Sequence, residues 1–435
     1  MADVEGPSEA RPTAAAASAA EPAPSAGIHA ITRRQFLSGG VAASVAGAAG
    51  LVVARHPWAA AHARRASIDG RGTLVMVTLY GGNDGLNTVI PFEDGHYLGG
   101  RAQLGYQPNE VLAIGDGLGL HPSLKGMKQL WGRGQLAIVR GVGYPNPSRS
   151  HFRSMDIWQS GVPDHDVPSG WLGRWLDTGT DPLRALSIGP NLPRLLAGER
   201  ASGAAVPLGA FRLPGGPSLS ASFADLQRPF PGEPALEARV AQSGADLLRV
   251  QSALAEALSH QPAPAPAGGA GPAAAPAGNP LAAQLDLVAR SIKSGLATRA
   301  YAVSLGGFDT HANEKQVHSE LLGQLDAALT GFASALAGDR RGQDVVTVVY
   351  SEFGRRVAAN ASGGTDHGTA APVLVAGPRV RGGFYGAEPN LADLDQGDIR
   401  FTTDFRSVYA TVLEGVLGVD SKVGLGARFA PLGFL

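Results

Sequence analysis

Six acidic and histidine side chains lie in glycine-rich segments next to apolar runs, where they could share a metal ion. They are Asp84, Asp309, His311, Glu352, Asp366 and His367. Carboxylate and imidazole groups without any thiolate suit Zn²⁺, Mn²⁺, Ca²⁺ or Mg²⁺. The residue types therefore indicate a divalent-metal site, and they leave the identity of the ion open.

Each of these side chains also has a structural explanation. An aspartate in a glycine-rich turn is frequently an Asx-turn or a helix cap. Glu352 could be a surface acid paired with Arg355 or Arg356. Asp309 and His311 are two residues apart, so in an extended segment they could face one side and share an ion. Their joint position favours the metal site, because ligands of open α/β sheets bind at the carboxyl ends of the strands.

A hydroxyl group at a predicted helix start could supply a nucleophile. Residues 144–152, with the sequence YPNPSRSHF, end a predicted strand and begin a predicted helix. Free N–H groups and the positive end of the dipole at a helix N-terminus can hold an anion beside such a hydroxyl. Ser150, Ser148 and Arg149 are therefore candidate catalytic residues. The alternative is that Ser148 or Ser150 only caps the helix.

These groups need a sheet to position them, and the sequence pattern predicts one. Apolar runs that end in glycine turns alternate with longer helical patterns, which is typical of βαβ units around a mostly parallel sheet. Strands are predicted at residues 73–80, 135–140, 185–188, 300–305, 345–351 and 372–376. Helices are predicted at residues 122–131, 151–159, 171–177, 234–259, 280–296, 314–336 and 403–417. We expect an α/β fold with helices on both faces of the sheet.

Two segments interrupt this alternation. Residues 197–233 are rich in Gly, Pro and Ser and are expected to form an irregular excursion. Residues 261–280 contain Ala, Pro or Gly at 18 of 20 positions, which predicts a low-complexity surface loop. Strands of the same type are predicted on both sides of each segment, so we expect residues 64–435 to form one domain.

The overall composition excludes several classes of protein. With 36 Lys+Arg against 37 Asp+Glu, the chain has no excess of positive charge for binding nucleic acid. It contains no cysteine, so disulfides, thiolate metal sites and cysteine nucleophiles are excluded. Hydrophobic residues make up 44% of the chain, which is enough for a sizeable core.

The first 63 residues read as a leader. Residues 1–30 have a composition typical of disorder. Arg33 and Arg34 then precede an uncharged stretch, 36–54, and an Ala-His-Ala sequence at 61–63. This pattern resembles a twin-arginine export signal with its cleavage site. The alternative is an N-terminal membrane anchor, although the stretch is rich in Ala and Gly. We expect a periplasmic or extracellular mature protein without a stable membrane span, and the twin-arginine export machinery as a partner.

Taken together, the motifs resemble the bacterial DUF1501 family, exported proteins of the alkaline phosphatase-like superfamily. The matching segments are residues 33–34, 81–85, 121–124, 149–152, 307–311, 351–355 and 366–368. The resemblance implies an alkaline phosphatase-like core with two adjacent metal ions at the carboxyl edge of the sheet. Asp84 would be the ligand after the first strand. Asp309, His311 and His367 would bind one ion, and Glu352 would bind the other.

The same resemblance implies a hydroxyl nucleophile, which fits Ser150 and less closely Ser148. One metal would lower the pKa of the nucleophile, and the pair would hold the oxygens of a phosphoryl or sulfuryl group. Two positions depart from the superfamily. Phe353 stands where alkaline phosphatases have a histidine, which puts the second metal in doubt. Pro145 stands where sulfatases have a cysteine, so formylglycine chemistry cannot occur.

The function expected from the sequence is an exported metal-dependent hydrolase of phosphate or other anionic esters. The alternative is a secreted binding or assembly protein that keeps the fold without turnover.

The export signal can be tested in living cells. Replacing Arg33 and Arg34 together with Lys should block export, because the twin-arginine machinery reads the arginine pair itself. Immunoblots of periplasmic and cytoplasmic fractions would measure the effect. Normal secretion of the double variant would overturn the twin-arginine interpretation.

Overall fold

The computed structural model describes residues 72–208, 216–228, 230, 232–259 and 278–435. The twin-arginine segment, the expected cleavage site and most of the segment 261–280 lie outside these residues. None of the helices in the described ranges combines the length and the apolar character that a membrane crossing requires.

A nine-stranded sheet forms the centre of the fold. Its strand order is β13-β5-β12-β9-β1-β8-β6-β7, and β16 also pairs with β5. The central strand β1 (Thr73–Leu79) pairs in parallel with β8 (Ala300–Leu305) and with β9 (Val345–Ser351). Strand β12 (Ala371–Ala376) runs antiparallel to both of its neighbours. The other strands are β5 (Leu136–Gly143), β6 (Ala185–Ile188), β7 (Ala204–Val206), β13 (Gly383–Tyr385) and β16 (Thr403–Asp404).

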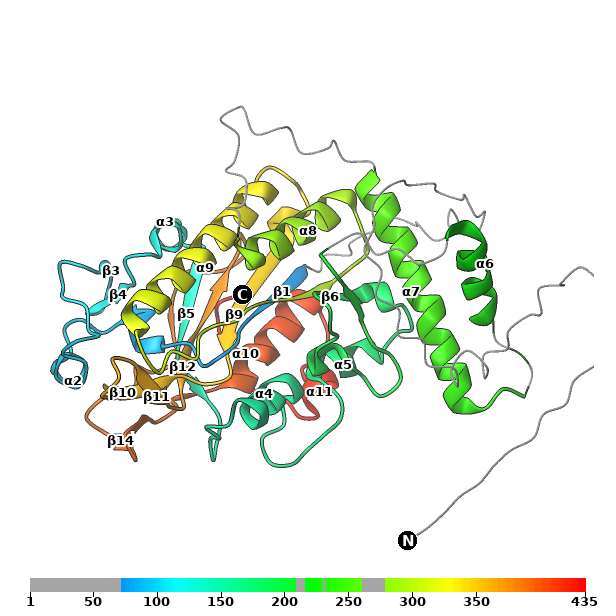
Figure 1. The fold of residues 1–435 in the computed structure, drawn as a ribbon. Helices are drawn as coiled ribbons and strands as arrows, with labels where there is room; N and C mark the ends of the chain where they lie inside the picture. The colour runs from blue at the N-terminus through cyan, green and yellow to red at the C-terminus, as the bar shows by residue number, and fades with distance from the viewer. Residues whose placement is uncertain (1–71, 209–215, 229, 231, 260–277) are drawn as a thin grey trace, which may run out of the picture. The chain divides into compact units, whose positions relative to one another are not determined.

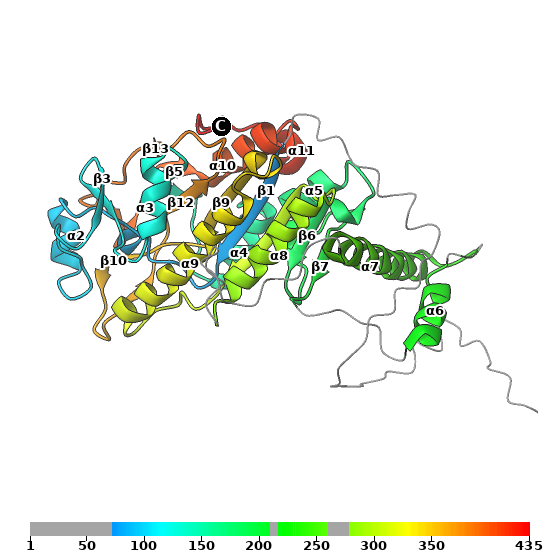
Figure 2. The same ribbon diagram turned by 90° about the horizontal axis from the view of Figure 1, so that it is seen from above.

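Helices cover both faces of this sheet (Figures 1 and 2). Val75 and Val77 of β1 belong to one apolar cluster, whereas Leu74 and Met76 belong to another. The first cluster includes residues of α3 (Lys125–Gly132), α8 (Pro280–Ser294) and α9 (Glu314–Leu336). The second includes residues of α4 (His151–Ser160), α5 (Trp171–Leu176), α10 (Phe405–Val412) and α11 (Lys422–Leu425). Successive side chains of a strand point to opposite faces, so β1 contributes to both layers. The predicted α/β class with a mostly parallel sheet is confirmed.

Several short elements were beyond the reach of sequence periodicity, which needs longer runs. Two are hairpins, β10 (Arg355–Ala359) with β11 (Thr365–His367), and β14 (Leu394–Asp395) with β15 (Asp398–Ile399). A small sheet contains β2 (Val89–Ile90), β3 (Leu112–Gly115) and β4 (Leu118–Leu120), and helix α2 (Gly95–Gly100) lies in the same part of the chain. The two hairpins matter most for function, because they bring residues to the site described below.

The structure differs from the predicted elements in the segment 197–233 and at the starts of two helices, since the helix predicted from residue 122 begins at Lys125. The segment 197–233 is not irregular throughout, because it contains β7 at the edge of the sheet and helix α6 (Gly216–Leu226). It is followed by α7 (Ala235–Ser259). The helix predicted from residue 403 begins instead at Phe405, because Asp404 caps it by accepting a hydrogen bond from Arg406 N at 2.9 Å.

Candidate metal centre

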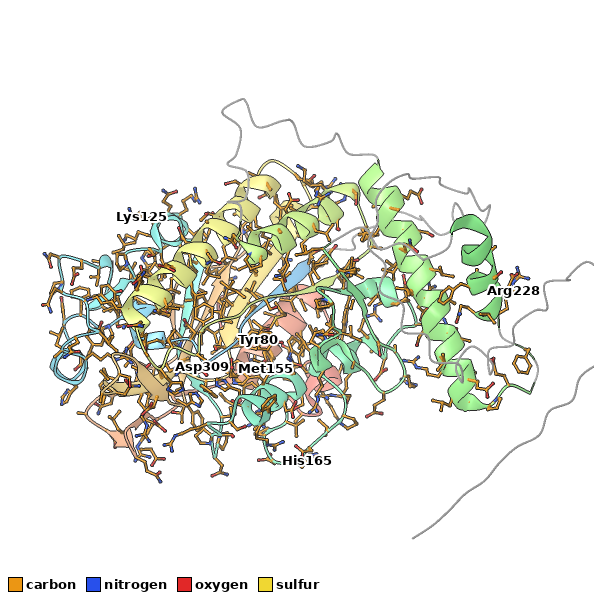
Figure 3. All side chains as sticks on the ribbon, viewed as in Figure 1. Tyr80, Lys125, Met155, His165, Arg228 and Asp309 are labelled. Atoms are coloured by element: carbon orange, nitrogen blue, oxygen red, sulfur yellow. The ribbon has the colours of Figure 1, made fainter. Side chains whose placement is uncertain are left out.

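The candidate site lies at the carboxyl edge of the three central parallel strands. The loops after β1 and β8, which carry Tyr80 and Asp309, lie side by side there (Figure 3). Phe308 N donates to Tyr80 O at 3.1 Å. Gly81 makes this approach possible, since its φ is +119° and a Cβ atom would lie 2.4 Å from Asp309 N. Because neighbouring parallel strands end at one edge, side chains far apart in sequence meet here.

Three histidines surround the carboxylate of Asp309. Its Oδ1 lies 3.1 Å from both His311 Nε2 and His367 Nε2, and its Oδ2 lies 3.5 Å from His151 Nε2. The ligand atoms of His151, Asp309 and His367 all lie within 4.8 Å of one another. The Asp309 side chain is 48% exposed, so the cluster is open to solvent.

Each histidine ring is oriented through its other nitrogen, Nδ1. The pairs are His151 with Glu352 Oε1 at 2.9 Å, His311 with Asp366 Oδ1 at 3.2 Å, and His367 with the Arg149 carbonyl oxygen at 2.9 Å. All three partners are acceptors, so each Nδ1 carries the proton and donates. In a neutral ring this leaves a lone pair on each Nε2, which is the arrangement of metal-binding histidines.

The Nε2 atoms around Asp309 lie close to one another. His311 Nε2 and His367 Nε2 lie 3.0 Å apart, and two lone pairs at that distance repel each other. His151 Nε2 is buried and has no hydrogen-bond partner among the described residues. Around a tetrahedral Zn²⁺ with bonds of about 2.0–2.1 Å, ligand atoms are separated by about 3.3 Å. The separations of Asp309 from His367, 3.1 Å, and from His151, 3.5 Å, are close to this value, and the ligand atoms of the three residues lie within 4.8 Å of one another.

Asp309 is suited to be the anionic ligand. Burial by itself would raise its pKa, but the hydrogen bond from Arg355 and the charge of that guanidinium outweigh burial and lower the pKa to about 2. Arg355 Nη2 donates to Asp309 Oδ1 at 2.7 Å. The carboxylate is therefore ionised across the physiological pH range.

Glu352 lies behind the cluster rather than in it. It is 1% exposed, and its Oε1 accepts a hydrogen bond from Gly81 N at 2.8 Å as well as contacting His151. Its Oε2 accepts from Ser351 Oγ at 3.0 Å. The alternative of a surface acid paired with arginine is wrong. The structure places Glu352 where it orients His151, because both of its oxygens are already engaged.

Asp84, which the sequence offered as a metal ligand, is not among the residues grouped around Asp309. It is fully buried and forms an ion pair with Arg101. Arg101 also donates to Val357 O at 2.9 Å, so its guanidinium is fixed against Asp84. A guanidinium thus already supplies the cation beside this carboxylate. Asp366 also acts indirectly, through His311.

The serines at the start of α4 have the geometry of the capping alternative. Ser150 is exposed and is the N-cap, and its Oγ accepts from Arg153 N at 3.5 Å. Ser148 Oγ accepts from Ser150 N at 3.2 Å. Arg149 forms an ion pair with Asp398, and its carbonyl holds His367. A nucleophilic role for Ser150 or Ser148 stays a prediction.

His151 is the residue that sequence reasoning missed. It follows the cap Ser150 directly and lies in the first turn of α4, at the carboxyl edge of the sheet. The motif at 149–152 stands out in the sequence for its hydroxyl groups, whereas the structure places the imidazole beside them among the candidate ligands. A histidine in a helix start that faces a predicted strand edge was the available signal.

Phe353 closes one side of the cluster. Its ring centroid lies 4.9 Å from that of His151 and 4.9 Å from that of His367. The ring also packs on Gly82, where a Cβ atom would lie 2.3 Å from Phe353 Cε2. Phe353 therefore presents an apolar wall to the cluster.

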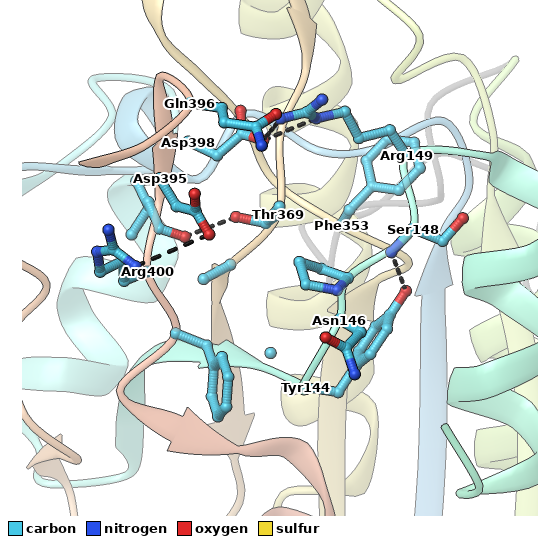
Figure 4. Close-up of a pocket in the computed structure, with 15 residues that line it drawn as sticks. Tyr144, Asn146, Ser148, Arg149, Phe353, Thr369, Asp395, Gln396, Asp398 and Arg400 are labelled. Carbon is cyan, nitrogen blue, oxygen red and sulfur yellow. Dashed lines mark hydrogen bonds and ion pairs between the residues drawn. The ribbon is translucent and has the colours of Figure 1, made fainter. Parts of the chain in front are cut away.

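A cavity of about 660 Å³ adjoins the cluster (Figure 4). Phe353 and Arg149 line it, and both also contact His367, through the phenyl ring and the backbone carbonyl respectively. The rest of its lining comes from residues 143–148, from 369–370 and from the segment of the β14–β15 hairpin, 395–401.

Asp84 and Glu314 form a buried pair of acids next to the site, and this pair makes the free energy of unfolding depend on pH. Burial, reinforced by Asp84, raises the pKa of Glu314 to about 9. Burial also disfavours the charged form of Asp84, but Arg101 outweighs it and holds the pKa of Asp84 well below its usual range. Glu314 Oε1 and Asp84 Oδ1 have no other partner among the described residues, so the protonated Glu314 can donate to Asp84.

Removing His151 tests the metal centre. Loss of a residue that only orients a ligand typically lowers metal affinity about 10–100-fold, and Glu352→Gln should lower Zn²⁺ affinity within this range. His151→Ala should lower Zn²⁺ affinity by more, because it removes a ligand. Titration calorimetry of metal-stripped protein with ZnCl₂ measures both. The exposed His165 provides a matched control, His165→Ala. Unchanged Zn²⁺ binding in His151→Ala would show that the cluster does not hold the ion.

Replacing Glu314 tests the buried acid pair. From about pH 4.5 to about pH 9 the folded protein holds a proton on Glu314 that the unfolded chain has lost, so stability falls as pH rises, by at most about 1.4 kcal/mol per pH unit. Glu314→Gln mimics the protonated form and removes this loss. The stability of the variant relative to the parent should therefore increase with pH across that range, as measured by urea unfolding. A constant difference would mean that Glu314 is ionised in the folded protein.

Several solved structures are similar to this chain. A protein in the alkaline phosphatase superfamily from Vibrio parahaemolyticus is 11% identical, with 82% of this chain and 69% of that chain covered and a TM-score of 0.38. The lipoteichoic acid synthase LtaP from Listeria monocytogenes is 10% identical, with 83% and 75% covered and a TM-score of 0.34. The C-terminal periplasmic domain of EcEptC from Escherichia coli, in complex with Zn, is 9% identical, with 71% and 74% covered and a TM-score of 0.31.

At TM-scores below 0.5, these likenesses add nothing to what the geometry of the chain itself shows. No curated protein matches the chain in sequence. A family model described as a protein of unknown function, DUF1501, matches residues 71–423, and the chain therefore belongs to the DUF1501 family.

Proposed function

We propose that this protein is an exported hydrolase of phosphate or other anionic esters that uses a divalent metal ion. The observation that carries the proposal is the convergence of three Nε2 atoms on the Asp309 carboxylate, with each Nδ1 held by an acceptor. This cluster lies at the carboxyl edge of the sheet, where α/β proteins bind their ligands.

Zn²⁺ fits the donor set best. His151, Asp309 and His367 would hold the ion, with His311 beside them. Imidazole-rich sites suit Zn²⁺, whereas Mg²⁺, Ca²⁺ and Mn²⁺ favour sites built from oxygen ligands. When bound, such an ion polarises an ester oxygen and lowers the pKa of a hydroxyl or water beside it.

One ion accounts for the donors better than the two that the family resemblance implies. Of the other candidate ligands, Asp84 is paired with Arg101, and Glu352 orients His151. Phe353 offers no donor atom. We therefore propose a single metal centre.

The start of α4 would bind and attack the ester. Its free N–H groups and its dipole favour an anion at this end of the helix. The Ser150 hydroxyl is exposed and accepts only a long hydrogen bond, so its proton can be given up to a base. We assign Ser150 as the nucleophile, with Ser148 and Arg149 as its neighbours in the anion site. Glu352 retains the Nδ1 proton of His151 and so keeps Nε2 free.

Substitution of Ser150 separates a nucleophile from a cap. As a nucleophile, Ser150→Ala should lower kcat for 4-nitrophenyl phosphate or sulfate by orders of magnitude, because the attacking oxygen is gone. As a cap alone, it should cost about 0.5–2 kcal/mol of unfolding free energy and leave turnover intact. Hydrolysis by Zn²⁺-loaded protein and urea unfolding measure the two effects.

Two further variants sharpen this experiment. Ser150→Asp caps well but has no hydroxyl, so it should be stable and inactive. Ser243→Ala, on the exposed surface of α7, is the control. An active Ser150→Ala enzyme would move the nucleophile to Ser148 or to water. Zn²⁺ binding without turnover of either ester would favour the alternative of a secreted binding or assembly protein.

A further inference from the structure

Asn360 follows β10 directly and begins the turn that leads to β11, the strand that carries His367. Its Oδ1 accepts hydrogen bonds from Ser362 N at 2.9 Å and from Gly364 N at 3.0 Å. The side-chain oxygen therefore closes the turn, which is a common task of asparagine. Because these two N–H donors identify the oxygen, the amide has one orientation, and its Nδ2 points away from the turn.

The Nδ2 group of Asn360 connects the turn to the cluster. It donates to the backbone oxygen of His311 at 2.9 Å. It also donates to Asp366 Oδ1 at 3.3 Å, and the same oxygen accepts from His311 Nδ1 at 3.2 Å. One amide nitrogen thus holds His311 twice, directly at its backbone and through Asp366 at its ring.

The turn itself is docked on the loop that carries His311. Thr365 N donates to Thr310 O at 3.3 Å. Gly364 allows the close approach, since a Cβ atom would lie 2.3 Å from the carbonyl carbon of His311. The backbones of the two segments are therefore fixed against each other, and the Asn360 side chain links them to the His311 ring.

The orientation of the His311 ring decides where its lone pair lies. Its Nε2 lies 3.1 Å from Asp309 Oδ1 and 3.0 Å from His367 Nε2. The hydrogen bond from Nδ1 to Asp366 sets this orientation, but the Asp366 side chain is 57% exposed. An exposed carboxylate can rotate unless a second group holds it, because water competes for its oxygens. Asn360 is the group that holds it.

We propose that Asn360 is a positioning residue of the metal cluster. By holding the Asp366 carboxylate and the His311 carbonyl, it keeps the Nδ1 proton of His311 directed at Asp366 and the Nε2 lone pair directed into the cluster. The effect on the ring is a property of the chain alone. Its consequence for a bound ion rests on the proposed metal-dependent function.

Replacing Asn360 with Asp separates the two halves of the amide. Asn360→Asp keeps the oxygen that closes the turn, but it replaces the donor with a carboxylate oxygen that repels Asp366. Long-range proton–nitrogen NMR correlations of metal-free protein, at a pH where the ring is neutral, would show which nitrogen of His311 carries the proton. We expect Nδ1 in the parent and a mixture of both tautomers in Asn360→Asp. Zn²⁺ affinity, measured by calorimetry, should fall about ten-fold, the lower end of the range for residues that orient a ligand.

A double-mutant cycle tests the route through Asp366. Asp366→Ala removes the carboxylate that Asn360 holds, so Asn360→Asp should lower Zn²⁺ affinity less in that background than in the parent. Asn390→Asp is the matched control, because Asn390 Oδ1 also accepts a backbone N–H in an exposed turn, from Ala392 at 2.9 Å. It should leave the His311 tautomer and the Zn²⁺ affinity unchanged.

A purely structural role would give different results. If Asn360 only closes its turn, Asn360→Asp should keep the parent tautomer, and an unchanged tautomer would overturn the proposal whatever the Zn²⁺ affinity. Equal losses of Zn²⁺ affinity with and without the Asp366 carboxylate would also overturn it. If Asn360→Asp does not fold, Asn360→Ser tests the same point, since a serine hydroxyl can close such a turn without an amide donor.

These measurements separate the positioning role from the hydrolase function. Zn²⁺ binding that Asn360→Asp weakens, in a protein that hydrolyses neither phosphate nor sulfate esters, would refute the hydrolase and support the positioning role. A changed His311 tautomer in a chain that binds no Zn²⁺ would refute the metal centre and leave the positioning of the ring in place. Ester hydrolysis by the parent, with an unchanged tautomer in Asn360→Asp, would overturn the positioning role while the hydrolase stands.

Discussion

The geometry of the site depends on one buried guanidinium. The Arg355 side chain is fully buried and donates to the carbonyl oxygens of Gly82 at 2.7 Å and Thr365 at 2.9 Å. It also donates to Phe308 O at 3.0 Å and to the Asp309 carboxylate. Arg355 therefore ties the loops after β1 and β8 to the β10–β11 hairpin. Since Asp309 and His367 lie on two of these segments, their separation is set by hydrogen bonds to one rigid fork.

This arrangement reconciles burial of a charge with a carboxylate that is open to solvent. A buried arginine is tolerated only when its N–H groups are satisfied and its charge is paired. Arg355 obtains its pairing from Asp309, which keeps the carboxylate ionised while 48% of its side chain stays exposed. A second cationic centre, Arg101, is enclosed completely with Asp84. The two aspartates differ because solvent reaches one pair and is excluded from the other, so the first suits binding and the second suits stability.

Phe353 divides the carboxyl edge into two chemical environments. On one side it packs against the rings of His151 and His367, and on the other it lines the cavity. The cluster is rich in acceptor atoms that face one another. In the cavity, by contrast, the two arginines and the two aspartates of the lining pair with each other.

Much of the fold follows from local sequence, because a buried strand must be apolar along its whole length and a helix must bury one face. The six main strands and the long helix from Glu314 to Leu336 were predictable for this reason. The short hairpins β10–β11 and β14–β15 were not, since their residues are held by contacts with distant loops rather than by their own pattern.

For the site, residue types and strand ends indicated a metal-binding edge with Asp309, His311 and His367. They did not reveal which acids contact the cluster directly and which only orient its histidines. That choice depends on contacts across the sheet. Arg101 pairs with Asp84, Gly81 N and Ser351 Oγ occupy Glu352, and the first turn of α4 brings His151 to Asp309. The sequence determines which chemical groups the side chains carry. Whether a lone pair faces other ligand atoms or a hydrogen-bond donor is decided only when distant segments pack together.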